Sequence, residues 1–144
     1  MVLYLGCSGG DADSSAEPAA RAETASGSPA ATPPPVEAPS GPIDRALASR
    51  GEEVFTVKGC VACHYVGRDE RLVGPDLEGV TSKRTWPWFY AMITNPDSMI
   101  RNDPEARALF AEYMTPMSKQ GLTDEEVQAV WEYLRDASSD GGGS

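Results

Sequence analysis

Residues 60–64 read Cys-Val-Ala-Cys-His, and His64 is the only histidine in the 144-residue chain. This spacing sets two cysteine sulfurs one helical turn apart, with an imidazole directly after the second sulfur. The sulfurs can add to the two vinyl groups of one haem, while the histidine supplies a nitrogen ligand to its iron. C-x-x-C-H is the attachment motif of haem c. We therefore expect Cys60, Cys63 and His64 to hold one covalently bound haem c.

Other interpretations of the motif fit less well. A structural zinc site needs four ligands, and the chain has no second cysteine pair, since the third cysteine, Cys7, stands far away near the N-terminus. A thioredoxin-like redox pair belongs in a βαβ context, and no apolar β-strand pattern surrounds this motif. Two buried cysteines beside an unrelated histidine are the simplest alternative. The motif and its context together favour haem c.

The charge of the chain argues against nucleic acid as a partner. Its formal net charge is −10, with 22 acidic and 12 basic residues, whereas DNA binding requires a basic patch. The length allows one small domain with appendages. No stretch approaches the roughly 20 apolar residues of a membrane-spanning helix.

The composition changes at about residue 43. Residues 8–42 are almost wholly Ala, Ser, Pro, Gly, Thr, Asp and Glu. Such a stretch buries too little apolar surface to offset the entropy lost on ordering. We predict a disordered tether over residues 8–42, a folded domain over 43–137 and a flexible tail over 138–144.

The first seven residues suggest a membrane anchor. Leu5-Gly6-Cys7-Ser8 resembles a bacterial lipoprotein processing site, at which cleavage leaves an N-terminal cysteine that receives lipid. The apolar run before Cys7 is shorter than the h-region of about 7–15 residues in a signal peptide. We expect residues 1–7 to be the remnant of a signal and Cys7 to be the lipid anchor, with a stray terminal cysteine as the alternative.

The pattern from residue 43 to residue 135 predicts helices. Leu47, Gly51, Val54 and Phe55 share one face of a first helix that ends at Gly59.

Three further helix starts follow from their capping residues. Thr85 or Trp86 begins a short helix that Pro96 stops. Asp103 is followed by a proline and an acid, which is a strong helix start. Residues 123–126, Thr-Asp-Glu-Glu, form a capping box. The last helix has one apolar face, made by Val127, Val130, Trp131 and Leu134.

The order of these features from about Ile43 to Arg135 resembles the class I cytochrome c family. It comprises a first helix, C-x-x-C-H, a Gly-Pro-Asp-Leu turn at residues 74–77, middle helices, a methionine loop and a last helix. The resemblance implies an all-α fold wrapped around one haem, with the first and last helices crossing at right angles. The contact positions that it implies on these two helices are Gly51, Phe55, Val130, Tyr133 and Leu134.

A methionine as sixth iron ligand would stabilise ferrous iron and raise the reduction potential. Met114 directly continues a predicted helix, so packing suits it. Met117 follows Pro116, which forbids helix continuation and presents an extended loop. Met117 also lies five residues before Leu122, and similar cytochromes place the ligand a short distance before such a Leu-Thr-Asp-Glu-Glu sequence. We expect Met117 to be the ligand, with Met114 as the alternative.

The resemblance also implies partners for the haem and its histidine. The carbonyl of Pro75 would accept a hydrogen bond from the His64 ring and hold its orientation. Four residues stand where family members place partners of the haem propionates, although packing or surface exposure is the alternative for each. They are Arg84, Trp86, Trp88 and Tyr90.

The function that the resemblance implies is one-electron transfer without turnover of a substrate. It extends to lipoprotein-type monohaem subunits of bacterial respiratory complexes. That resemblance implies a periplasmic position at a membrane. The partners that it implies are a quinol-oxidising complex, such as alternative complex III, and a haem-copper oxidase. A haem sensor or peroxidase with an open sixth iron position is one alternative, but peroxidase chemistry normally uses a distal base and no second histidine exists. A second alternative function is a subunit whose haem is only structural.

Overall fold

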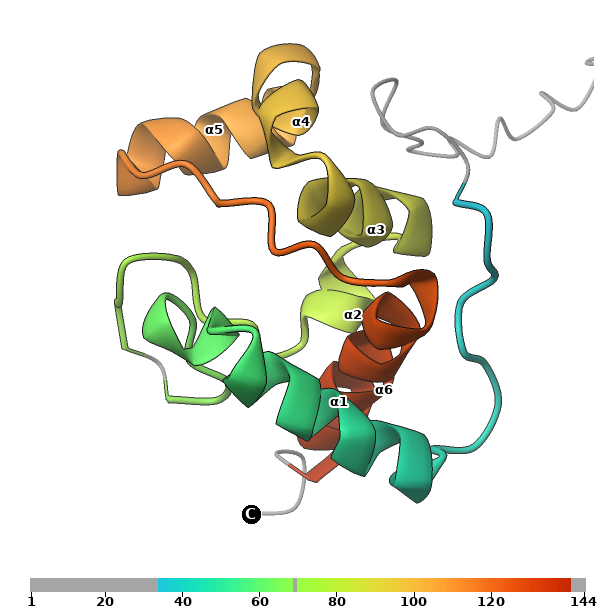
Figure 1. Ribbon diagram of the computed structural model, residues 1–144. Helices are drawn as coiled ribbons and strands as arrows, with labels where there is room; N and C mark the ends of the chain where they lie inside the picture. The colour runs from blue at the N-terminus through green and yellow to red at the C-terminus, as the bar shows by residue number, and fades with distance from the viewer. Residues whose placement is uncertain (1–33, 69, 141–144) are drawn as a thin grey trace, which may run out of the picture.

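The computed structural model describes residues 34–68 and 70–140 of the chain (Figure 1). Cys7 and residues 8–33 of the expected tether lie outside this part. The elements are α1 (Arg45–Val57), the 3-10 turn η1 (Cys60–Ala62), α2 (Val80–Lys83), α3 (Trp86–Thr94), α4 (Pro96–Asn102), α5 (Pro104–Tyr113) and α6 (Asp124–Asp140). The described residues contain no strand, so the all-α prediction is confirmed. None of their helices is both long and apolar enough to cross a bilayer.

The helix starts follow from capping side chains. Asp44 accepts hydrogen bonds from the first backbone N–H groups of α1, and Thr85 caps α3. Pro96 stops α3 as expected, but it also begins α4, with Asn95 as the cap. A proline fits there because the first-turn N–H groups of a helix have no intrahelical partner. Asp103 caps α5 in the same way.

The capping box at the start of α6 is complete. The Thr123 backbone N–H donates to Glu126 Oε2 at 2.9 Å, and the Glu126 backbone N–H donates to Thr123 Oγ1 at 3.3 Å. The predicted apolar face of α6 is buried in the main core, against α1 and α3. That core consists of Val54, Phe55, Trp86, Phe89, Ile93, Val127, Val130, Trp131 and Leu134.

Helices α1 and α6 approach each other closely where they cross near Gly51 (Figure 1). A Cβ atom at Gly51 would lie 1.9 Å from the carbonyl oxygen of Ala129 and 2.8 Å from Cβ of Tyr133. The ring of Tyr133 packs against that of Phe55, with the centroids 5.5 Å apart. Glycine is therefore required at the crossing because the backbone of α6 occupies the place of a side chain.

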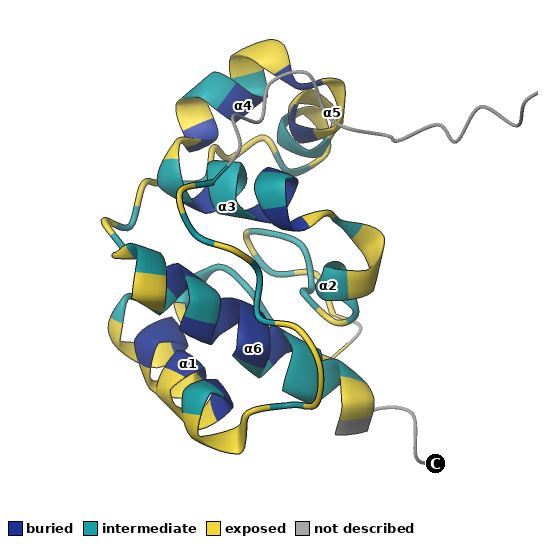
Figure 2. Cartoon of the chain, turned by 90° about the vertical axis from the view of Figure 1, so that its right-hand side faces the viewer, coloured by how far each residue is buried: buried dark blue, intermediate teal, exposed yellow. Residues whose placement is uncertain are grey.

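The ordered domain begins before the boundary expected at residue 43. Residues 36–41 lie along α3 and α6 (Figure 2), and Val36 and Ala38 pack against the main core. Side chains of the domain donate hydrogen bonds to backbone carbonyls of this stretch. Composition alone places the start of the domain too late, because the side chains that hold residues 36–41, those of Trp86, Gln128 and Arg135, lie far along the chain.

The C-terminal boundary, expected after residue 137, also differs from the prediction. Helix α6 continues to Asp140, into the range 138–144 for which the sequence predicts a flexible tail. The Ser138 hydroxyl accepts a hydrogen bond of 3.0 Å from the Gly79 backbone N–H and donates one of 2.6 Å to the Leu134 carbonyl. The contact with Gly79 ties the last turn of α6 to the start of α2.

Candidate functional site

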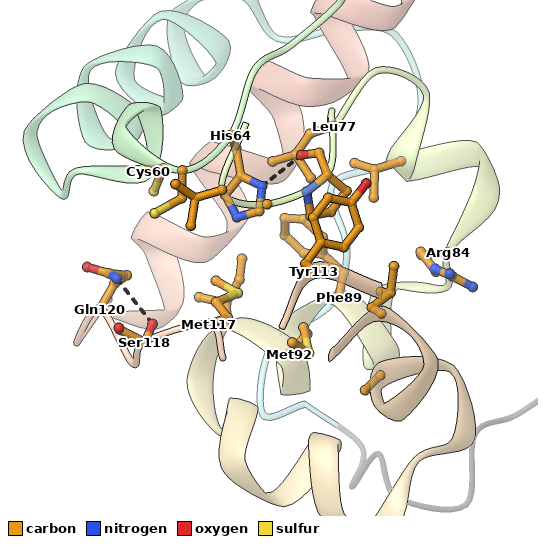
Figure 3. A pocket seen from close by; sticks show the side chains of 18 of the residues that line it. Cys60, His64, Leu77, Arg84, Phe89, Met92, Tyr113, Met117, Ser118 and Gln120 are labelled. Carbon is orange, nitrogen blue, oxygen red and sulfur yellow. Dashed lines mark hydrogen bonds between the residues drawn. The ribbon is translucent and has the colours of Figure 1, made fainter. Parts of the chain in front are cut away.

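One cavity of about 370 Å³ lies at the centre of the fold. Residues 59–64 and the following loop line one side, helices α3 to α5 and residues 115–118 line the other, and α6 closes the back. Most of the lining side chains are apolar. Cys60, Cys63, His64 and Met117 all contribute to the walls (Figure 3).

His64 is held in one orientation by a single backbone contact. Its Nδ1 lies 2.8 Å from the carbonyl oxygen of Pro75, the contact that the family resemblance implied. A carbonyl can only accept, so Nδ1 carries the hydrogen and Nε2 keeps its lone pair. Burial lowers the pKa of His64, against the opposing effects of the Pro75 hydrogen bond and the Asp76 charge. The neutral imidazole is the form that binds a metal.

Gly74 makes room for this ring. A Cβ atom there would lie 2.6 Å from Cε1 and 2.9 Å from Nδ1 of His64. The residue before the proline is therefore a glycine for a steric reason, because any side chain would displace the imidazole.

The two cysteines come from the short turn after α1. Gly59 ends the helix in the left-handed conformation, with a φ of 78°. The N–H groups of Cys63 and His64 then bond to the Cys60 carbonyl at 3.1 and 2.9 Å, which winds the motif into a single turn. Both thiols are free and half-buried. Burial raises the pKa of the Cys60 thiol.

The structure separates the two candidate methionines. Met117 is partly buried, packs against the main core and lines the cavity on the side facing His64 (Figure 3). Met114 is 75% exposed and ends α5 in the left-handed conformation, with a φ of 53°. It is not among the cavity-lining residues. Of the pair, Met117 is the one that lines the cavity.

Among residues 34–68 and 70–140, the segment 115–122 makes no backbone–backbone hydrogen bond. It joins α5 to α6 past the cavity without helix or strand, and Leu122 packs against the core at its far end. The position of Met117 therefore depends on side-chain contacts.

Two of the expected propionate partners line the cavity but are engaged elsewhere. Trp88 Nε1 donates to the buried carboxylate of Asp103 at 3.1 Å. The Arg84 guanidinium donates to Glu105 Oε2 at 2.6 Å and lies 4.7 Å from the centre of the Trp88 ring. These contacts give both side chains a packing role at the cavity wall.

The other two candidates, Tyr90 and Trp86, are not cavity-lining residues. The Tyr90 hydroxyl donates to Asp124 Oδ1 at 2.6 Å, and Trp86 Nε1 donates to the Val36 carbonyl at 2.9 Å. The polar group of each side chain is thus engaged by a protein partner, and a role for either residue at the cofactor stays a prediction.

Sequence reasoning missed a link across one edge of the cavity. The Arg71 guanidinium donates to the Glu112 carbonyl at 2.6 Å and lies 4.5 Å from the centre of the Tyr113 ring. Tyr113 lines the cavity. Arg71 thus joins the loop after His64 to the end of α5, and the sequence carries no signal for a contact between residues so far apart.

The residues present fit a haem. The cavity has apolar walls for a large flat ring, two free thiols and an imidazole on one side, and a thioether on the other. No group of three or more His, Cys, Asp or Glu side chains in the described part of the chain could instead hold a bare metal ion. Thiols, imidazole and thioether are the groups that c-type cytochromes present to iron and porphyrin.

A family model described as "Cytochrome c" matches residues 48–138. The chain belongs to the cytochrome c family. It is 54% identical over 35 residues to cytochrome c-551 of Pseudomonas denitrificans and 48% identical over 33 residues to cytochrome c-551 of Azotobacter vinelandii. These matches cover 24% and 23% of this chain, and only 40% and 38% of the relatives' lengths.

Solved structures match over a longer range. The cytochrome c of Rhodothermus marinus is 36% identical, with a TM-score of 0.69, and the match covers 76% of this chain and 91% of that one. An engineered form of that cytochrome is 35% identical, with a TM-score of 0.68, over 75% and 91%. Cytochromes c carry covalently bound haem c and are electron-transfer proteins rather than enzymes. The predicted family, fold class and cofactor are confirmed.

Proposed function

We propose that this cytochrome is a one-electron carrier of a membrane-associated respiratory chain, with its iron held by His64 and Met117 and its haem attached through Cys60 and Cys63. The observation that carries the ligand assignment is that His64 and Met117 face each other across one apolar cavity (Figure 3). Haem c supplies the redox chemistry, taking up and releasing one electron between ferric and ferrous iron.

The surrounding residues tune and protect that chemistry. The Pro75 carbonyl, 2.8 Å from His64 Nδ1, fixes the imidazole and raises its basicity as a ligand. The thioether of Met117 favours the ferrous state. Phe55, Leu77 and Phe89 line the walls and exclude water from the ring. A dry, apolar site of this kind disfavours the extra charge of ferric iron and so raises the potential.

An edge of the haem would be accessible beside the attachment motif, where the neighbouring side chains are exposed. Val61 is 46% exposed and Ala62 is exposed, and Pro116 of the methionine segment is exposed at the cavity rim. Small apolar side chains of this kind suit brief docking contacts with redox partners. We infer that electrons enter and leave here.

The cellular setting rests on the N-terminal sequence. Cytochromes c are typically extracytoplasmic, and we propose that Cys7 carries lipid and holds the protein at the periplasmic face of a membrane. A quinol-oxidising complex such as alternative complex III would then be the electron donor and a haem-copper oxidase the acceptor. A tether raises the effective concentration of the carrier near such partners. Intact-mass measurement of the native protein tests the anchor: an unmodified N-terminus at Met1 would refute it and leave the electron-carrier proposal untouched.

The axial ligand is tested by a matched pair of methionine variants. Met117→Ala should abolish the methionine-to-iron charge-transfer band, lower the reduction potential and let the ferrous iron bind carbon monoxide. Met114→Ala removes the same side chain three residues away, at a position that is 75% exposed, and should leave band and potential unchanged. If Met114→Ala abolishes the band and Met117→Ala retains it, the assignment is refuted.

A further inference from the structure

Helices α4 and α5 pack on a small core of their own. Trp88 of α3, Met99 of α4 and Ala106 of α5 form a second buried cluster, separate from the main core that α1 and α6 share. The two helices lie on the far side of α3 from α1 and α6 (Figure 1). The cavity is lined from both clusters, by Phe55 and Val130 of the main core and by Trp88 and Ala106 of the second. Contacts that cross the cavity therefore help to fix where α5 stands.

Two arginines from the chain between His64 and α3 bind α5, one at each end. Arg84, directly before α3, donates to Glu105 Oε2 at 2.6 Å, in the first turn of α5. Arg71 donates to the Glu112 carbonyl at 2.6 Å, in the last turn. The segment that follows the haem-binding histidine thus fastens the helix from which the methionine segment departs.

The contact of Arg71 with the end of α5 has three parts. Its guanidinium donates to the Glu112 carbonyl, lies 3.8 Å from Glu112 Oε1, and stands 4.5 Å from the centre of the Tyr113 ring. The last carbonyls of a helix have no intrahelical partner, and a cation near them interacts favourably with the helix dipole. Helix α5 has no basic residue in its own last turn. Arg71 therefore supplies from another segment the donor and the cation that this helix end lacks.

The methionine segment begins directly after this contact. Met114 ends α5 in the left-handed conformation, and Met117 follows three residues later. In the described chain, residues 115–122 make no backbone–backbone hydrogen bond. Three residues of fully extended chain reach at most about 10 Å. The position of the end of α5 therefore limits where the Met117 sulfur can lie.

We propose that Arg71 is a positioning residue for the axial methionine, which holds the end of α5 at the distance from which Met117 reaches the iron. The proposal rests on the proposed function, since it takes Met117 to be the ligand. Arg71 is not among the residues that line the cavity, so it acts through the Glu112 carbonyl and the Tyr113 ring. Without this contact the end of α5 can move away from the loop after His64, and the state with Met117 off the iron becomes more populated.

The exposure of the contact limits the size of the effect. The Arg71 side chain is 60% exposed and that of Glu112 is 56% exposed. Ion pairs between such exposed groups contribute little. A hydrogen bond from a charged donor and a contact of a cation with a ring remain favourable at a surface. We therefore expect removal of the Arg71 side chain to raise the equilibrium constant for dissociation of Met117 about fivefold.

The test heats the ferric, haem-loaded full chain and follows the methionine-to-iron charge-transfer band together with far-UV circular dichroism. The band reports the bond to Met117, and the dichroism reports the helices. At a temperature at which the wild type has lost about a tenth of the band, a fivefold increase corresponds to a loss of about a third in Arg71→Ala. The dichroism at that temperature should stay at the wild-type value, because the helices remain folded. A purely structural role would instead change both signals together and would refute the proposal.

Arg68→Ala is the matched control. Its guanidinium also stands over an aromatic ring, 4.9 Å from the centre of Tyr65, but this contact stays within the loop. Arg68 is exposed like Arg71 and lies three residues before it. Arg68→Ala should lose no more of the band than the wild type. Equal losses in Arg68→Ala and Arg71→Ala would overturn the proposal.

A third variant separates the backbone contact from the ion pair. Glu112→Gln removes the carboxylate that lies 3.8 Å from Arg71 and keeps the carbonyl to which Arg71 donates. It should lose the band as the wild type does, and a loss as large as that of Arg71→Ala would refute the role assigned to the carbonyl.

Failure of the proposed function would look different from failure of this inference. If Met117 is not the ligand, the band survives in Met117→Ala or is missing from the wild type. If the band depends on Met117 but Arg71→Ala behaves as the wild type does, the role of Arg71 alone is refuted.

Discussion

Replacing Gly51 by alanine should destabilise this cytochrome more than any exposed substitution in the same helix. The added Cβ would lie 1.9 Å from the Ala129 carbonyl oxygen and 2.5 Å from its carbon. Carbon and oxygen approach comfortably only to about 3.3 Å, so α1 and α6 would have to separate by roughly 1.4 Å. Both obstructing atoms are backbone atoms and cannot rotate away. Even a gap of about 0.5–1 Å forfeits a quarter to a half of a dispersion contact.

We expect a loss of about 3 kcal/mol or more in the free energy of unfolding, at the upper end of typical overpacking costs. For a domain of about 100 residues that corresponds to a fall in Tm of at least roughly 12 °C. The assay is thermal and urea unfolding of the haem-loaded protein, followed by far-UV circular dichroism. Ser49→Ala, exposed on the same helix, should stay within about 0.5 kcal/mol of the wild type. If the Gly51→Ala protein is as stable as that control, the claim that the crossing of α1 and α6 requires glycine at this position is refuted.

Two further predictions concern Tyr90 and the ring of His64. The hydrogen bond to Asp124, followed by burial and the charge of the same carboxylate, raises the pKa of Tyr90 to about 12. An unfolded tyrosine titrates near about 10, so this contribution to stability is complete below about pH 10 and is lost as the pH rises from about 10 to 12. Asp124→Asn should move the phenolate absorbance titration of Tyr90 back towards 10, and an unchanged titration would contradict the assigned cause. Gly74→Ala should push the His64 ring away from the Pro75 carbonyl and raise the reduction potential of the haem, because an imidazole without that hydrogen bond is less basic and stabilises ferric iron less. An unchanged potential would show that the His64 ring tolerates the added methyl group without moving.

Sequence reasoning succeeded where a structural feature depends on neighbouring residues. The starts of α5 and α6 were predictable because Asp103 and Thr123 each cap a backbone N–H three residues away. The start of the domain was not predictable in this way. Val36 and Ala38 are too few to form an apolar pattern, and the donor that holds this stretch most firmly, Arg135, lies almost 100 residues later.

For the site, too, the residues that could be predicted are those that depend on neighbours in the sequence. The cysteine–histidine motif and the choice of Met117 over Met114 follow from local spacing and from Pro116, and the structure places these groups around one cavity. The roles of Trp88 and Tyr90 could not be predicted. Their polar atoms are engaged by Asp103 and Asp124, whose proximity arises only when α3 packs against α5 and α6.

The methionine segment, residues 115–122, has a kinetic consequence. Since the described segment makes no backbone–backbone hydrogen bonds, the proposed bond from Met117 to the iron would be its strongest attachment between α5 and Leu122. Local opening of such a segment requires little more than breaking that bond, while the rest of the domain stays folded. An added small ligand such as imidazole would then reach the iron only during these openings. At high ligand concentration its observed binding rate should level off at the opening rate, so that saturation kinetics would report how often the segment leaves the iron.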